Sequence, residues 1–373
     1  MSTYVVRRLA ISIPLLLVFS FIMYLALYKA GDPLARFRAV PGIRAEDLQR
    51  IIRLNHLDQP WYEGYWGWLK GFVTGDWGTS AVNPNNTATE EIGRRLPATL
   101  ELLGGALIVS TIIGAFLGIF SALRRYSGFD YSSTAFAYLG YAMPTFLLGL
   151  FLQMFAIWMK DNGWAVIPFV AGLILILATI FHVRRSKPAL VTCGIGLAVA
   201  ILSLVFWDRF GGNGELVFFT QTRFSPGNSS IWSLDHFRHL VLPVVTLSVI
   251  SIAGWSRYQR SAMLDVLNAD YLRTARAKGL PERDVIGRHA LRNAMLPLIT
   301  VMAIDIAALF SGAVITEQVF AWPGIGTLFL SSAFDRNVPV AMGIVMIGAI
   351  TVIVFNLLAD VGYSLADPRI RLA

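Results

Sequence analysis

The chain has 373 residues, of which 55% are hydrophobic and only 14% are charged. Soluble domains carry roughly 25% charged residues, so the composition excludes a water-soluble globular protein. The net charge is +8 and the mean hydropathy is +0.60. Because the lysines and arginines cluster at the ends of apolar runs, the positive charge indicates orientation in a membrane and argues against a nucleic-acid partner.

Eight apolar runs are long enough to cross a hydrocarbon layer about 30 Å thick as helices. We therefore expect an all-α integral membrane protein. The runs cover residues 9–28, 99–123, 131–158, 165–181, 189–207, 240–256, 296–315 and 340–363. Two short inner runs, 165–181 and 189–207, form either two spans or a re-entrant hairpin. Pro144 and Pro243 interrupt apolar runs and are expected to kink or end helices.

Basic residues in short loops predict the orientation, because such loops stay in the cytoplasm. If every run crosses the membrane, all the basic loops fall on one side, and both termini are cytoplasmic. Removing the hairpin leaves this parity unchanged. The basic loops contain Arg7, Arg8, Arg124, Arg125, Arg184, Arg185, Lys187, the segment 257–292, Arg369 and Arg371.

The predicted organisation has three parts. Residues 1–28 form the first transmembrane helix, 29–98 an external segment, and 99–373 the main transmembrane domain, with an inserted hairpin at 165–207. The external segment carries five aromatic residues within eight positions, which favours helices at the headgroup boundary. The arginine pair before the first span also resembles a secretory signal, but the apolar run is long enough to remain as a membrane span.

The chain contains no recognisable catalytic motif. A phosphate-binding loop of the Gly-x-x-x-x-Gly-Lys-Ser/Thr type is absent, so ATP hydrolysis is not expected in this chain. Cys193 is the only cysteine, and no two of the five histidines have the His-x-x-x-His spacing, so neither a metal site nor a cofactor is expected. His236 and His239 lie three residues apart at a predicted helix entrance, where hydrogen bonding is the favoured role.

The basic segment 257–295 carries the strongest signal. Gly279 is expected to end one short helix and Pro281 to start the next, with Glu282 complementing the positive end of that helix. Leu280, Val285 and Ile286 would then form an apolar knob that fits a groove in a soluble partner. The alternative is a juxtamembrane anchor for anionic lipid.

At these residues the sequence resembles the permeases of binding-protein-dependent ABC importers for dipeptides, oligopeptides and nickel, in particular their first, B-type subunit. The matching motifs span nearly the whole chain. They are Gly31-Asp32-Pro33, Leu57-Asp58-Gln59-Pro60, Gly75-Asp76-Trp77-Gly78-Thr79-Ser80, Arg95-Leu96-Pro97-Ala98-Thr99-Leu100-Glu101, Tyr271-Leu272-Arg273-Thr274-Ala275-Arg276-Ala277-Lys278-Gly279-Leu280, His289-Ala290-Leu291-Arg292-Asn293-Ala294, Phe320-Ala321-Trp322-Pro323-Gly324-Ile325-Gly326 and Asp367-Pro368-Arg369-Ile370-Arg371. Arg273 replaces the glutamate that names the family's cytoplasmic EAA loop, so contacts cannot be copied from other importers.

The resemblance implies a bundle of about six core transmembrane helices in the bacterial inner membrane, to which the hairpin adds two. It also implies a second permease, two cytoplasmic ATPases that hold ATP and magnesium, an external binding protein and a peptide substrate, with nickel or another small solute as the alternative. Segment 257–295 is then the cytoplasmic coupling loop. The expected ATPase-coupling residues are Arg273, Thr274, Ala275, Arg276, Lys278, Gly279, Leu280, Pro281, Val285, Ile286, His289 and Arg292.

Charged residues at membrane depth are candidates for the translocation pathway, because a carboxylate there costs about 2.5–3.5 kcal/mol. Asp305 lies in the middle of an apolar run, and Glu101 and Glu317 lie near the outer ends of others. Each has a structural role as its alternative. The rival function is an intramembrane enzyme that uses Asp305 with Glu101 or Glu317 as an acid–base pair. A passive channel or proton-coupled carrier would need no coupling loop.

Overall fold

The computed structural model describes residues 2–29, 46, 49, 52, 60–80, 82, 85–162, 222–225 and 230–366. Within these residues all the regular elements are helices, apart from one isolated antiparallel bridge between Thr79 and Thr87. The chain divides into two compact units, Met1–Gly104 with Ala303–Ala373 (the first unit) and Gly105–Met302 (the second unit). Two helices, α5 and α14, contribute residues to both units.

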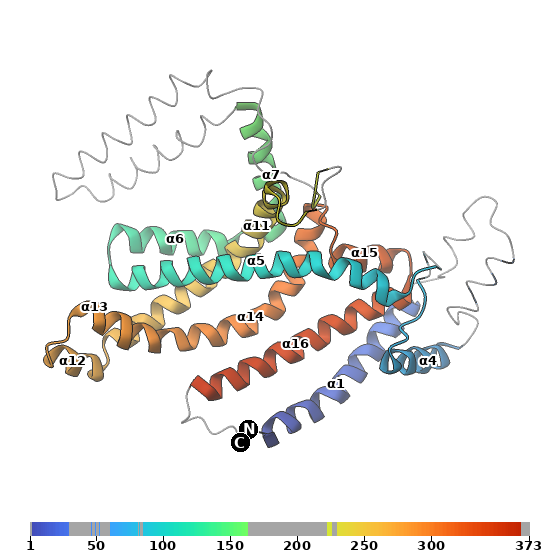
Figure 1. Ribbon diagram of the computed structural model, residues 1–373, viewed down its shortest axis with the longest axis horizontal. Coiled ribbons are helices and arrows are strands. Elements are labelled where there is room, and N and C mark those ends of the chain that lie inside the picture. Colours follow the sequence, from blue (N-terminus) through green and yellow to red (C-terminus); the bar gives the residue numbers. More distant parts are fainter. Residues whose placement is uncertain are drawn as a thin grey trace. The chain divides into compact units, whose positions relative to one another are not determined.

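Figure 1 shows the helices in chain order. They are α1 (Ser2–Lys29), α4 (Trp61–Thr74), α5 (Ala88–Leu123), α6 (Gly128–Ala142), α7 (Thr145–Asn162), α11 (Leu234–Leu267), α12 (Asp270–Ala277), α13 (Glu282–Asp284), the π-helix η1 (Val285–Ala290), α14 (Leu291–Val319), α15 (Ile325–Phe334) and α16 (Val338–Ala366).

Four of the described helices are long and apolar enough to cross a membrane, and α6 with α7 makes a fifth if the two count as one bent span. The four helices are α1, α5, α11 and α16, and they contain the predicted runs 9–28, 99–123, 240–256 and 340–363. The run 296–315 is helical as part of α14. The runs 165–181 and 189–207, and with them the hairpin 165–207, lie outside the described residues. The helical structure is therefore confirmed where it is described.

The predicted run 131–158 does not form one straight helix. The chain forms α6 and α7 instead, with a bend of 108° between them. Pro144 explains the break, because it has no N–H to donate and its ring disfavours helical geometry at the preceding residue. Met143 is accordingly extended, with φ −87° and ψ 122°. Pro243, in contrast, lies inside α11, and the helix continues past it to Leu267.

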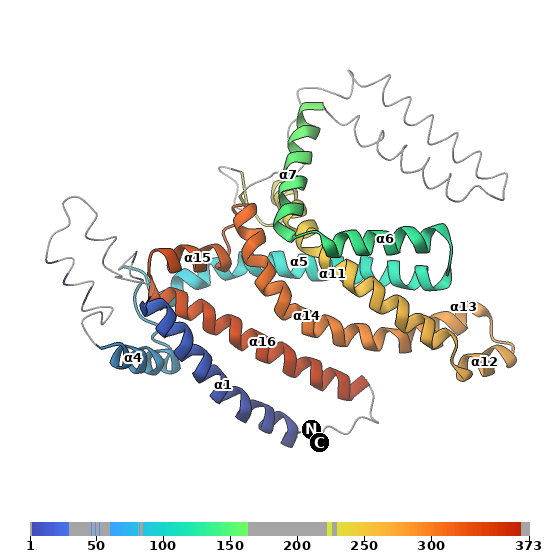
Figure 2. The same ribbon diagram turned by 180° about the vertical axis from the view of Figure 1, so that it is seen from behind.

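In the first unit, α1 packs along α16, and the two lie side by side in both views (Figures 1 and 2). Tyr24 of α1 and Tyr65 of α4 are buried together, and the Tyr65 hydroxyl lies 3.0 Å from the hydroxyl of Ser20. The opposite end of α1 is joined to α16 by an ion pair of 2.7 Å between Arg8 and Asp360. The start of α1 and the end of α16 therefore lie at the same end of this unit.

In the second unit, α11 packs against α6 and α7, and α5 contacts α11 through glycines. A Cβ at Gly118 would lie 2.6 Å from both the Ser256 carbonyl oxygen and the Gln259 Cβ. The Ser248 hydroxyl, which also donates to Val244 within α11, lies 3.3 Å from the Ala106 carbonyl oxygen of α5. The close contact between these two helix backbones therefore requires a residue without a side chain, glycine, at position 118.

We expect Gly118→Ala to destabilise the protein by about 1–3 kcal/mol, because the added methyl group meets a backbone carbonyl that cannot move alone. Thermal unfolding in detergent micelles measures the change. Gly254→Ala in α11 is the control, since a Cβ there has no neighbour within 4 Å. That substitution should stabilise the helix by up to about 1 kcal/mol. Equal responses of the two variants would contradict the proposed close packing.

Candidate functional site

The segment between α11 and α14 consists of a short helix (α12), a turn, and α13 with η1, which lead into α14. The apolar side chains on one side of this segment are buried. Leu272 and Ala275 of α12 pack with Val285 and Ala290 of η1. The same cluster contains Ala122, Met263 and Ala294, from the end of α5, the end of α11 and the start of α14. The segment is therefore fixed to three long helices of the second unit, and its other side faces outward.

The end of α12 confirms the predicted role of Gly279. Its φ is +78°, in the left-handed region that glycine adopts without steric cost. The Gly279 N–H donates to the Arg276 carbonyl at 2.9 Å, and the Leu280 N–H lies 3.4 Å from the Ala275 carbonyl, which together make a Schellman motif. Pro281 has φ −63° and ψ 143°, so it caps α13 and does not form its first residue as predicted.

Arg276 and Glu282 clamp the two sides of this turn. The guanidinium donates to the two carboxylate oxygens at 3.1 and 2.9 Å. This hydrogen bonding lowers the pKa of Glu282 and raises that of Arg276. Both side chains are solvent-accessible, so the pair contributes mainly to the geometry of the turn and little to global stability.

The predicted apolar knob is wrong. Val285 is fully buried in the core described above, and Ile286 packs against the same core, so neither side chain is available as predicted. Leu280 alone of the three is exposed, at 40%. The physical reason is that α13, η1 and α14 follow one another without a gap, and this continuous helix turns Val285 toward Leu272.

The outward side of the segment is polar and basic. Ala275 is buried, as is Val285, so these two predicted coupling residues support the segment from inside. Of the other predicted coupling residues, Ile286 is half-buried and the rest are exposed. The exposed ones are Arg273, Thr274, Arg276, Lys278, Gly279, Leu280, Pro281, His289 and Arg292. A hydrogen bond of 2.9 Å from the Asn293 amide to the Tyr271 hydroxyl holds α12 against the start of α14.

An ion pair that the sequence analysis missed joins α6 to α11. Arg260 donates to the two carboxylate oxygens of Asp130 at 2.7 and 2.8 Å, and Asp130 is only 3% exposed. Asp130 also accepts from the Tyr126 N–H at 2.9 Å, while its own N–H lies 3.3 Å from the Ser127 hydroxyl. The sequence indicates the cap that Ser127 provides, because a serine three residues before an acidic residue is typical of a helix start. It does not indicate Arg260, which lies 130 residues later in the chain.

Glu317 has a structural place in the first unit. It is fully buried and accepts hydrogen bonds from the Thr99 hydroxyl at 2.6 Å and the Thr327 N–H at 3.0 Å. The Thr99 hydroxyl in turn accepts from the Ile325 N–H at 2.8 Å. A Cβ at Gly324 would overlap the Glu317 carboxylate, so glycine is required there. Glu317 thus holds the turn between α14 and α15.

The other two pathway candidates are not joined to Glu317. Asp305 is half-buried in α14, and Glu101 is half-buried in α5. Among the described residues Glu317 makes no hydrogen bond to either carboxylate. Asp305 and Glu317 are twelve residues apart in one helix, a separation of about 18 Å along its axis. That distance is too long for Asp305 and Glu317 to act as an acid–base pair.

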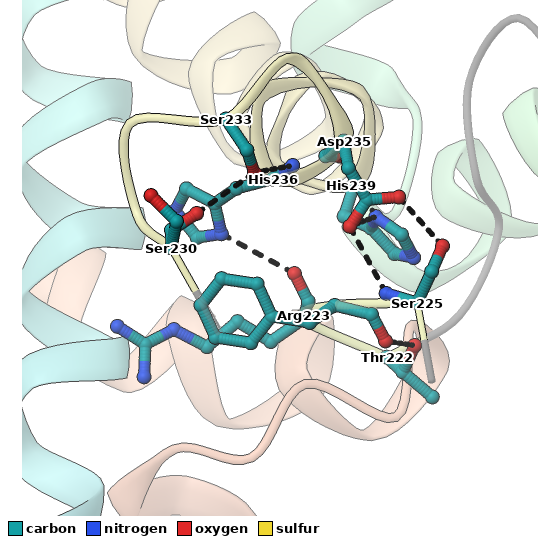
Figure 3. Close-up of polar contacts among 9 residues, drawn as sticks. Thr222, Arg223, Ser225, Ser230, Ser233, Asp235, His236 and His239 are labelled. Atoms are coloured by element: carbon teal, nitrogen blue, oxygen red, sulfur yellow. Dashed lines mark hydrogen bonds and ion pairs between the residues drawn. The ribbon is translucent and has the colours of Figure 1, made fainter. Parts of the chain in front are cut away.

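His236 and His239 lie at the start of α11, next to residues 222–225 (Figure 3). Their Nδ1 atoms lie 3.2 Å from the Arg223 carbonyl oxygen and 2.9 Å from the Asp235 carbonyl oxygen. The Asp235 carboxylate accepts from the N–H and the hydroxyl of Ser225. The hydrogen-bonding role expected for the two histidines is confirmed. In the described part of the chain, no three His, Cys, Asp or Glu side chains are arranged to hold a metal ion.

Apolar helices of membrane length, together with an exposed basic segment anchored to three of the long helices, define an α-helical integral membrane protein. The sequence profile of the binding-protein-dependent transport system inner membrane component matches residues 176–372. The chain belongs to this family.

Relatives of similar length agree with this assignment. The oligopeptide transport system permease protein AppB of Bacillus subtilis (strain 168) is 36% identical over 372 residues, covering 100% of both chains. The dipeptide transport system permease protein DppB of Escherichia coli (strain K12) is 33% identical, covering 100% of this chain and 99% of its own. The di/tripeptide transport system permease protein DppB of Pseudomonas aeruginosa (strain UCBPP-PA14) is 34% identical with the same coverage. These relatives are transport permease subunits.

Proposed function

We propose that this chain is one of two permeases of an ATP-driven peptide importer and forms half of its translocation pathway. The observation that carries the proposal is full-length identity of 33–36% to permeases named for oligopeptide, dipeptide and di/tripeptide transport. The partners are a second permease, two ATPases that bind ATP and magnesium, and an external peptide-binding protein. The chain itself has no catalytic role and binds no cofactor. Nickel or another small solute is the alternative cargo.

The proposed arrangement in the membrane has about eight spans with both termini in the cytoplasm. The ion pair between Arg8 and Asp360 supports placing both termini on one side, because it joins the start of α1 to the end of α16. Ala122, at the end of α5, packs with the segment around α12. This contact supports the predicted placement of the loop after α5 on the same side as the coupling segment.

We infer that α12 is the element on which the ATPases act. It has eight residues, and the helical structure is interrupted at each of its ends, whereas α13 continues directly into η1 and α14. Its exposed basic side is available to a cytoplasmic partner, and its buried Leu272 lies in one cluster with Met263 of α11 and Ala294 of α14. A push on α12 is therefore passed to two long helices, which fits alternating access driven by closure of the ATPases.

Gly279→Val tests this coupling. A β-branched side chain in the left-handed region costs about 1–2 kcal/mol, which disfavours the native turn about five- to thirtyfold. We expect the variant to insert and to pair with the second permease, while ATP hydrolysis loses its response to the peptide-loaded binding protein and uptake falls. Uptake and ATP hydrolysis are measured with the complete importer in proteoliposomes.

Gly287→Val is the matched control. Gly287 is exposed in the same segment and has no neighbour within 4 Å of its Cβ position, as is true of Gly279, but it is not among the residues with positive φ. The Gly287→Val variant should keep most of the coupling.

Replacing Arg276 and Lys278 by Gln tests the lipid-anchor alternative. If the segment is a lipid anchor, this double replacement weakens lipid binding, and Gly279→Val remains active in uptake. Normal uptake with Gly279→Val would disprove the coupling role of α12.

A further inference from the structure

A polar cavity of about 240 Å³ lies in the first unit, beside the start of α5. Arg94 and Arg95 of α5 line one side, and Ser331 and Asp335 at the end of α15 line another. Asn86 completes the rim. Asn86, Arg94 and Arg95 come before the apolar run that starts at Thr99, while Ser331 and Asp335 lie between the runs 296–315 and 340–363. The predicted topology places both segments on the outer side of the membrane.

Hydrogen bonds fix the backbone around the cavity. The Ser80 N–H donates to the Asn86 carbonyl at 2.9 Å, which closes the short loop before α5. The Asn337 side-chain amide donates to the Ser80 hydroxyl at 2.8 Å, and its backbone N–H donates to the Ser332 carbonyl at 2.7 Å. The cavity therefore exists before any ligand arrives, which lowers the entropic cost of binding.

The two arginines give the cavity its chemistry. Within the described part of the chain, neither the Arg94 nor the Arg95 guanidinium takes part in an ion pair or hydrogen bond. Guanidinium groups match carboxylates in a bidentate geometry. The lining also contains the carboxylates of Glu91 and Asp335, so it carries charges of both signs. A zwitterion suits this lining better than a simple anion.

The size of the cavity limits the ligand. Pockets for whole drug-sized ligands are about 300–1,000 Å³, so a volume of about 240 Å³ accepts only a very short peptide or the end of a longer one. We propose that this cavity binds the C-terminal carboxylate of a short peptide, with Arg94 and Arg95 as the carboxylate-binding residues. The inference rests on the proposed function as a peptide permease and assigns a subsite within it.

The test measures binding of tri-alanine to the complete importer in phosphatidylcholine nanodiscs, without ATP or binding protein, by saturation-transfer NMR. We expect wild type to bind tri-alanine at least tenfold more tightly than tri-alanine amide, which lacks the terminal carboxylate. The double variant Arg94→Gln, Arg95→Gln should lose this preference. Lys70→Gln should keep it, because Lys70 is an exposed cation of α4 in the same unit but does not line the cavity.

Three outcomes would overturn the proposal: equal binding of the acid and the amide, an unchanged preference in the arginine variant, or displacement of tri-alanine by phosphatidylglycerol, which would make the site a lipid phosphate site. Uptake of tri-alanine by the wild-type importer with its binding protein is measured in parallel. Uptake without binding at the cavity disproves the subsite and leaves the proposed function intact. Absence of uptake of every peptide tested disproves the proposed function itself.

Discussion

Asp130→Ala should destabilise the second unit by about 2–3 kcal/mol. The substitution leaves the Arg260 guanidinium without its carboxylate, and breaking a buried ion pair costs about 3–5 kcal/mol. We expect a cost at the low end of this range or below it, because the Arg260 side chain is 29% exposed. The Tyr126 N–H loses its acceptor as well. Thermal unfolding in detergent measures the loss, and uptake should fall with it because α6 is held less firmly against α11.

A second substitution separates the ion pair from simple loss of packing. Adding Arg260→Ala to Asp130→Ala removes the unpaired charge, so the double variant should be less destabilised than the sum of the two single variants. Asp270→Ala is the control, since its pair with Arg273 spans 3.5 Å between side chains that are 95% and 74% exposed. It should change stability by less than about 1 kcal/mol. Additive single effects would contradict a coupled pair.

Features fixed by neighbours in the chain could be predicted from the sequence. Apolar runs identified the helices, because lipid forces the backbone to satisfy its hydrogen bonds within each segment. Gly279 was identified as a helix end because its left-handed conformation is a local requirement. The break at Pro144 was also indicated, but its 108° angle was not, since the angle depends on how α6 and α7 pack against α11.

Features that depend on distant contacts could not be predicted. The buried side of the helix formed by α13 and η1 was misassigned, because only the position of Leu272 shows that Val285 faces inward. Glu317 was selected from the sequence as a charged residue near the outer end of an apolar run. The sequence could not show that its hydrogen bonds go to Thr99 and Thr327, which lie on two other helices. Burying a charge costs free energy, so a buried carboxylate indicates that some group binds to it. The sequence does not show whether that group belongs to the transported substrate or to the protein itself.

Glu317 variants can separate these two roles. Glu317→Ala removes the acceptor for the Thr99 hydroxyl and the Thr327 N–H, and each unsatisfied buried donor costs about 1–3 kcal/mol. We therefore expect a loss of about 3 kcal/mol or more in the stability of the first unit. Glu317→Gln keeps one side-chain oxygen as an acceptor, so its loss should be about half as large. Thermal unfolding and uptake are measured on both variants in the complete importer.

If Glu317 is structural, stability and uptake should fall together in the order wild type, Gln, Ala, because the turn between α14 and α15 loosens in proportion to the lost hydrogen bonds. A pathway role predicts another pattern, in which Gln abolishes uptake while the unfolding temperature stays unchanged, since only the charge is lost. Gln318→Ala is the control, because Gln318 is exposed on the same turn of α14 and should change stability by less than about 0.5 kcal/mol. If Glu317→Gln loses uptake but keeps wild-type stability, Glu317 therefore acts in the translocation pathway.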